Sequence, residues 1–155
     1  MASHFLPRGK PYNRIGVLTT QQKMLEQHFG FLRCYIRQNV LICTGKLTDP
    51  DWKHHYHVKI ECVAGTEPKS TIIFPVIQPS REIHMYPDHS LCLSYDGDVV
   101  WNARTELYRY TIPWIVEWIH YYEIYLSNGG KWEGPESMVH LRIDDMNVNI
   151  EHGTI

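Results

Sequence analysis

The chain has 155 residues, of which 43% are hydrophobic and 21% are charged, and its formal net charge is -2. This composition excludes a disordered tail, a collagen and a coiled coil, and it predicts one globular domain, residues 1–155, with a sizeable core. No apolar run reaches the roughly 18 residues of a membrane span, and the N-terminal stretch lacks the apolar centre of a signal peptide. We therefore expect a cytoplasmic protein with reduced thiols, and the lack of a basic run argues against nucleic-acid binding.

The first predicted element is a helix over residues 20–37. Thr19 to Gln22 has the spacing of a capping box, and apolar residues then recur at three- and four-residue steps as far as Ile36. Residues 1–18 are interrupted by proline and glycine, so we expect them to be irregular.

Three strands are predicted next. Residues 40–47 are rich in β-formers and end at a turn, residues 56–62 alternate between apolar and polar, and residues 71–77 form a third strand with Pro75 at an edge or bulge position. Because short turns join the three strands, we expect an antiparallel meander.

A second helix is predicted from Thr111, as N-cap, to about Ser127. Pro113 lies in its first turn, and two glycines after Asn128 end it. Its aromatic residues spread around the helix, which predicts burial on more than one side and a place in the centre of the core. We expect residues 141–155 to be irregular.

The densest group of reactive side chains lies in residues 84–93, inside a long stretch without periodicity. Long ordered loops in small domains are usually functional. A cysteine with histidines nearby can be held partly as thiolate, the form that attacks acyl carbons, and this would apply to Cys92. The alternative is that Cys92 is a small buried hydrophobe. We interpret Cys34, on the first helix, and Cys43 and Cys62, on strands, as structural.

Metal and cofactor sites are not predicted. His54, His55 and His57 form a cluster before a strand, and His84, His89 and Cys92 have the chemistry of zinc ligands. However, the chain has no Cys-x-x-Cys pair and no His-Glu-x-x-His motif, and it has no phosphate-binding loop.

The order of helix, meander, irregular flap and core helix resembles the ubiquitin-conjugating enzyme fold, an α+β fold with a meander of three to four strands. His84 stands where that family's His-Pro-Asn signature begins, Cys92-Leu93 resembles its catalytic Cys-Leu, and Trp101 resembles the Trp that follows. The segments 84–93, 112–118 and 130–136 are more similar to a bacterial branch of that fold. Genes of this branch often lie in antiphage operons beside a cyclic-dinucleotide-synthase-like nucleotidyltransferase. The resemblance covers residues 20–140.

This resemblance implies an acyl carrier. Cys92 would accept a partner protein's C-terminal carboxyl as a thioester and transfer it to an amine, and the nucleotidyltransferase would be the partner. Because no phosphate loop is present, activation of the carboxyl must come from another domain or from a separate activating enzyme.

The resemblance also assigns roles to neighbours of Cys92. Tyr86 stands where the eukaryotic family has the Asn credited with stabilising the oxyanion, a role that a backbone N–H near Leu93 could also fill. His84 would order the loop by a hydrogen bond or transfer a proton, and His89 would lower the pKa of Cys92. The other candidates, which would orient or deprotonate the amine or else form a solvated turn, are Asp96, Asp98 and Asn102.

Two further hypotheses stay open. The departures from the family signature at Met85 and Tyr86 suggest a catalytically inert scaffold that only binds partners. A cysteine hydrolase would need a histidine held against the thiol by an Asp or Asn.

Overall fold

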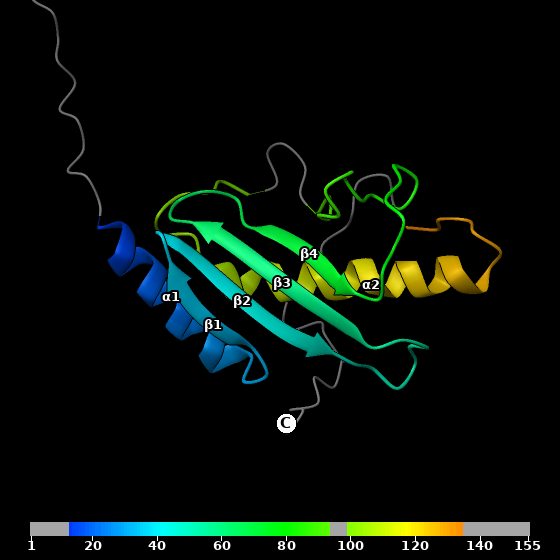
Figure 1. Cartoon of the computed structure of the whole chain (residues 1–155), viewed down its shortest axis with the longest axis horizontal. Coiled ribbons are helices and arrows are strands. Elements are labelled where there is room, and N and C mark those ends of the chain that lie inside the picture. Colours follow the sequence, from blue (N-terminus) through cyan, green and yellow to red (C-terminus); the bar gives the residue numbers. More distant parts are fainter. Residues whose placement is uncertain (1–12, 94–98, 135–155) are drawn as a thin grey trace, which may run out of the picture.

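The computed structural model describes residues 13–93 and 99–134. It is an α+β fold, as predicted (Figure 1). Its elements in chain order are α1 (Arg14–His28), β1 (Arg33–Arg37), β2 (Val40–Leu47), β3 (Tyr56–Val63), β4 (Lys69–Phe74), the 3-10 helix η1 (Leu107–Arg109) and α2 (Thr111–Ser127). The expectations for Asp96, Asp98 and residues 141–155 lie outside the described residues.

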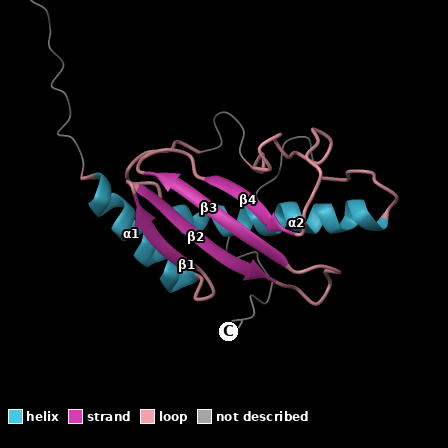
Figure 2. Cartoon of the chain, viewed as in Figure 1, coloured by secondary structure: helices cyan, strands magenta, loops and turns pink. Residues whose placement is uncertain are grey.

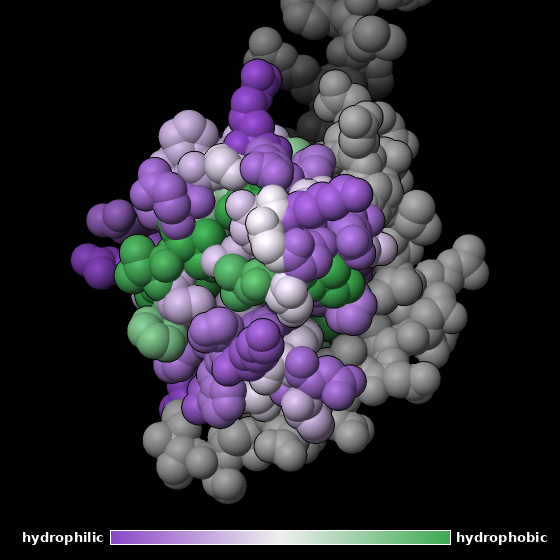
Figure 3. Space-filling model, turned by 90° about the vertical axis from the view of Figure 1, so that its right-hand side faces the viewer, coloured by the Kyte–Doolittle hydropathy of each residue, from purple (hydrophilic) through white to green (hydrophobic). Residues whose placement is uncertain are grey.

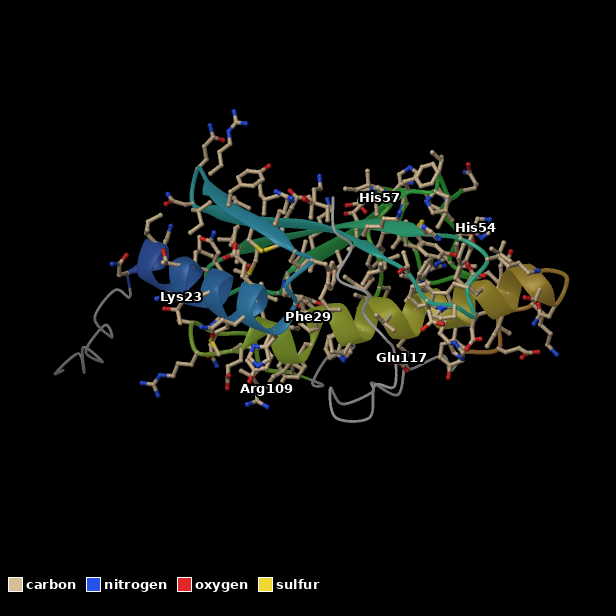
Figure 4. All side chains as sticks on the ribbon, turned by 90° about the horizontal axis from the view of Figure 1, so that it is seen from below. Lys23, Phe29, His54, His57, Arg109 and Glu117 are labelled. Carbon is tan, nitrogen blue, oxygen red and sulfur yellow. The ribbon has the colours of Figure 1, made fainter. Side chains whose placement is uncertain are left out.

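The four strands form one antiparallel sheet in the order β1-β2-β3-β4, and α2 runs along one of its faces (Figures 1 and 2). The predicted alternation in β3 is confirmed, because Tyr56, Val58 and Ile60 are buried while His57 is exposed. Figure 4 shows His57 on the face of the sheet turned away from α2. A period of two along the strand therefore separates the core from the solvent.

The prediction for the first helix was wrong at both ends. The side chain of Asn13 caps the helix by accepting a hydrogen bond from the N–H of Gly16, so residues 14–18 are helical rather than irregular. Residues 33–37 form β1, which places Cys34 on a strand opposite Cys43. The two-residue turn at Gln38 and Asn39, both with positive φ, allows this hairpin. Strand pairing with β2 thus outweighed the helical spacing of the apolar residues.

The third predicted strand is shifted. β4 begins at Lys69 and ends at Phe74, so Pro75 lies just beyond the strand rather than within it. Proline has no N–H to donate to the ladder, which explains this end. The irregularity in the register lies instead on β3, between His57 and Val58.

The second helix is confirmed over residues 111–127, although Thr111 is its first residue and Tyr110 the N-cap. Trp118, Ile115 and Ile119 are completely buried, and this agrees with the predicted central position. No helix among the described residues is long and apolar enough to cross a membrane.

A buried carboxylate ties the far half of α2 to the loop before β3. Glu123 accepts hydrogen bonds from the Tyr56 hydroxyl at 2.6 Å and from the backbone N–H of Lys53 at 2.9 Å and of His54 at 3.2 Å. Burial by itself raises the pKa of Glu123, but these hydrogen bonds lower it overall. Figure 4 shows His54 beside this half of the helix. The network fixes the sheet relative to α2.

Candidate active site

The loop after β4 folds back on itself between His84 and Cys92, a segment that we call the flap. Within it, the Tyr86 N–H donates to the Ser90 carbonyl at 2.8 Å, and the Cys92 N–H donates to the His84 carbonyl at 2.9 Å. Figure 2 shows the connection between β4 and α2 as loop for most of its length. The flap is therefore a narrow hairpin-like structure whose two arms hold each other through the backbone.

The sheet and α2 anchor the flap from two sides. The Leu91 N–H donates to the Ser70 carbonyl on β4 at 2.8 Å, and the indole N–H of Trp118 donates to the Ile83 carbonyl at 2.7 Å. Met85 and Leu91, one on each arm of the flap, are buried. These contacts hold the arm carrying Cys92 against rigid elements, as positioning of a reactive group requires.

A charged turn closes the tip of the flap. Asp88 accepts hydrogen bonds from the N–H and the hydroxyl of Ser90, at 3.0 and 2.6 Å, and forms an ion pair with Lys69 of β4 at 2.8 Å. The hydrogen bond from Lys69, followed by those from Ser90, holds the pKa of Asp88 well below its usual range. Asp88 therefore stays ionised at neutral pH and fixes the tip to the sheet.

The geometry brings Tyr86 and Cys92 together. The phenol of Tyr86 donates a hydrogen bond to Sγ of Cys92 at 3.2 Å. Cys92 is half-buried and Tyr86 is 51% exposed, so the pair lies at the surface, where a partner can approach it. A phenol that donates to sulfur stabilises a thiolate, and it lies near the place where an oxyanion would form during acyl transfer, because that oxygen would be two bonds from the sulfur.

His84 contacts Cys92 through its backbone. Its carbonyl accepts the Cys92 N–H, while its ring packs against the ring of Trp132 with 5.4 Å between centroids. Its φ of 55° is a left-handed conformation, which a surrounding structure must hold in place. Of the two roles considered for His84, this geometry favours ordering the loop.

Two of the remaining candidates, His89 and Asn102, lie among the described residues. The His89 side chain is exposed, and within the described residues no hydrogen bond joins its imidazole to Cys92. Asn102 closes its own turn, because its side chain accepts the N–H of Arg104 at 2.8 Å. Catalytic roles for both stay predictions.

The other cysteines differ from Cys92 in their surroundings. Cys43 and Cys62 are buried, and burial raises the pKa of Cys62 to about 11. A hydrogen bond with Cys34, together with burial, also raises the pKa of Cys43. Cys34 is half-buried on β1. The two buried thiols therefore stay protonated at neutral pH and do not compete as nucleophiles.

Residues without an obvious catalytic type also build the site. Sequence reasoning missed the ion pair of Lys69 with Asp88 and the contact of Trp132 with His84, since both join segments far apart in the chain. The spacing of Asp88 and Ser90 is a recognisable signal for a local turn. Within the described residues, 13–93 and 99–134, no three His, Cys, Asp or Glu side chains form a set that could hold a metal ion.

A helix, an antiparallel four-stranded meander, a flap that presents a cysteine and a core helix together define a protein of the ubiquitin-conjugating enzyme (E2) class. The family model of the Type II CBASS E2 protein matches residues 21–140, and the chain belongs to this family of bacterial E2-like proteins of antiphage CBASS operons. The resemblance inferred from the sequence is thus confirmed. A comparison with curated proteins gives no match.

Proposed function

We propose that this protein, acting as a single domain, is a thioester-forming acyl carrier whose nucleophile is Cys92. The observation that carries the proposal is the hydrogen bond from Tyr86 to the Cys92 sulfur at 3.2 Å, at the surface of the flap. Membership of the Type II CBASS E2 family supports an E2-like role in defence. A partly exposed thiol with a donor aimed at it suits a group that alternates between thiolate and thioester.

The proposed reaction has two steps. First, the Cys92 thiolate attacks the carbonyl carbon of an activated C-terminal carboxyl, the new S–C bond forms, and the activating group leaves with its electron pair. Second, an amine attacks the thioester, the N–C bond forms, and the Cys92 thiolate leaves while the amine loses a proton to a base. Tyr86 has a single donor proton, so it would serve the thiolate before attack and the oxyanion afterwards.

The proposed donor of the carboxyl is a cyclic-dinucleotide-synthase-like nucleotidyltransferase of the same operon. A thioester keeps the acyl group reactive, so the transfer to the amine needs mainly orientation and charge stabilisation. A separate activating enzyme would supply the activated carboxyl. Asp96, Asp98 and Asn102 stay candidates to orient the amine or to deprotonate it.

Reconstitution tests the proposal. The purified protein is mixed with the operon's nucleotidyltransferase and with an activating enzyme plus ATP, and adducts are separated without reductant. We expect an adduct that thiol reductants dissolve, a reductant-resistant ester with Cys92→Ser, and no adduct with Cys92→Ala. Cys34→Ala is the matched control and should behave as wild type, because Cys34 lies on β1, away from the flap. Full adduct formation by Cys92→Ala would show that Cys92 is not the nucleophile, whereas no adduct with the wild-type protein would favour the inert scaffold.

A further inference from the structure

The segment after α2 turns back toward the flap. Asn128 and Lys131 close this turn by two reciprocal hydrogen bonds of 2.7 and 2.9 Å, and Gly129 and Gly130 supply the positive φ angles of 85° and 89° that it requires. Figure 1 shows the segment, in orange, returning from the end of α2 toward the loop that follows β4. We call residues 128–134 the strap.

The strap carries Trp132 into an aromatic cluster under the flap. Its ring centroid lies 5.4 Å from that of His84, 5.9 Å from Tyr121 and 6.2 Å from Trp118. Trp118 in turn donates its indole N–H to the carbonyl of Ile83. Two tryptophans, one from the strap and one from α2, thus contact His84 at the start of the flap and Ile83 just before it.

The contact with His84 leads directly to the nucleophile. The carbonyl of His84 accepts the N–H of Cys92 at 2.9 Å, and the φ of His84 is held at 55°. A non-glycine residue keeps this conformation only where its surroundings fix it. Two contacts therefore link Trp132 to the backbone of Cys92: its packing on the His84 ring, and the hydrogen bond from the Cys92 N–H to the His84 carbonyl.

Aromatic packing is the contact that the described residues make with the Trp132 side chain. Among the described residues, its buried indole N–H has no hydrogen-bond partner. Space around it is tight, because a Cβ on Gly134 would lie 2.7 Å from the indole nitrogen and 3.0 Å from Cγ of Tyr121. The aromatic ring contributes the contacts with these neighbours, and the N–H group makes no hydrogen bond to any residue that the structure describes.

We propose that Trp132 is a positioning residue for Cys92: it holds His84 in the conformation that sets the Cys92 backbone for acyl transfer. This inference rests on the proposed acyl-carrier function for its kinetic readout only. Its structural readout is the Cys92 N–H, whose exchange with solvent reports whether the flap is held.

The test compares four variants with the wild-type protein. Trp132→Ala removes the ring, Gly134→Ala displaces it by adding a Cβ where 2.7 Å is available, and Trp132→Phe keeps an aromatic ring without the N–H. Trp52→Ala is the matched control. Trp52 lies in the loop before β3, and its indole packs on Tyr56 rather than on the flap. Hydrogen exchange of the 84–93 peptide, thermal unfolding, and the single-turnover rate of thioester formation at several partner concentrations are measured.

Trp132→Ala and Gly134→Ala should raise exchange in the 84–93 peptide and lower the single-turnover rate at saturating partner by about tenfold or more, while the half-saturating partner concentration is unchanged. Trp132→Phe should restore both readouts to within about threefold of wild type, since no hydrogen bond is lost. Trp52→Ala should lower the unfolding temperature without changing either readout.

Unchanged exchange of the 84–93 peptide in Trp132→Ala overturns the inference, whatever the transfer assay shows. A Trp132→Phe variant as impaired as Trp132→Ala also overturns it, because the N–H would then be the functional group. If the wild-type protein forms no adduct at all, the proposed function fails, and the exchange measurement alone decides whether Trp132 holds the backbone of Cys92.

Discussion

The phenol of Tyr86 donates to the sulfur of Cys92 at 3.2 Å, and the two residues lie six positions apart in the chain. The flap produces this proximity by pairing its two arms, with the Tyr86 N–H bound to Ser90 and the Cys92 N–H bound to His84. The backbone of the flap, which is anchored to β4 and α2, therefore directs the Tyr86 hydroxyl toward the proposed nucleophile.

Removing this hydroxyl should slow acyl transfer. We expect Tyr86→Phe to lower the single-turnover rate of thioester formation by about 10- to 100-fold, the usual effect of losing one hydrogen bond to a developing charge. The unfolding temperature should stay constant, because Tyr86 is 51% exposed. Tyr35→Phe is a matched control, since Tyr35 is 50% exposed on β1. A Tyr86→Phe rate equal to that of wild type would assign oxyanion stabilisation to the backbone instead.

The four thiols should react with iodoacetamide at different rates at pH 7.5. Cys92 should be labelled first, because it is partly exposed and a donor faces its sulfur, and Cys34 should follow. Cys43 and Cys62 should react only on unfolding, since both are buried and the pKa of Cys62 is raised to about 11. Peptide mass spectrometry over time measures this order. Labelling of Cys92 as slow as that of Cys62 would support an inert scaffold.

The ion pair at the tip of the flap should affect transfer rather than folding. Asp88→Asn and Lys69→Ala should each lower the rate of thioester formation severalfold with little change in unfolding temperature, as expected for an exposed pair. The double variant should be no slower than either single variant, because both remove the same contact. Additive losses would show that the two residues act separately.

The pair should also persist across the neutral range. The pKa of Asp88 is lowered, so its interaction is present above the ordinary Asp value of about 4 and is lost only as the pH falls below that value. The rate ratio of wild type to Asp88→Asn should accordingly be constant between pH 6 and pH 8. A ratio that changes across this range would point to a different titrating group.

The buried carboxylate of Glu123 should contribute stability that is lost at acid pH. Glu123→Gln should lower the free energy of unfolding by about 2 kcal/mol at pH 7, because hydrogen bonds to a charged acceptor are lost inside the protein. Since the pKa of Glu123 is lowered in the folded state, its contribution is present above its ordinary value of about 4.5 and disappears as the pH falls below it. In urea unfolding, the difference in the free energy of unfolding between wild type and Glu123→Gln should be smaller at pH 3 than at pH 7. Glu117→Gln on the same helix provides a comparison, and equal curves for Glu123→Gln and wild type would contradict the assignment.

Exposed apolar side chains do not form one continuous face at the end of the molecule seen in Figure 3. They emerge in a broken band between hydrophilic residues. The most exposed large hydrophobic residues described are Val76 at 88% and Val100 at 77%, and they flank the flap in the sequence on either side. Scattered exposure of this kind is ordinary for a protein surface.

Local sequence patterns were enough to predict β2, β3 and α2. Period-two alternation specified β3, β-rich residues and turn chemistry specified β2, and aromatic content between a proline and two glycines specified α2, because each of these signals acts within one element. The reactive group of residues around Cys92 and the family resemblance were also readable, since they depend on residue types and order.

The end of α1, the residues of β1 and the side chains that meet at the site depend on packing between distant segments. Residues 33–37 carry a spacing that suits a helix, yet pairing with β2 makes them a strand. The contacts of Trp132 with His84 and of Lys69 with Asp88 join segments whose separation in the chain carries no local signal. Such contacts form only when the packed core brings distant segments together, and no periodicity records them.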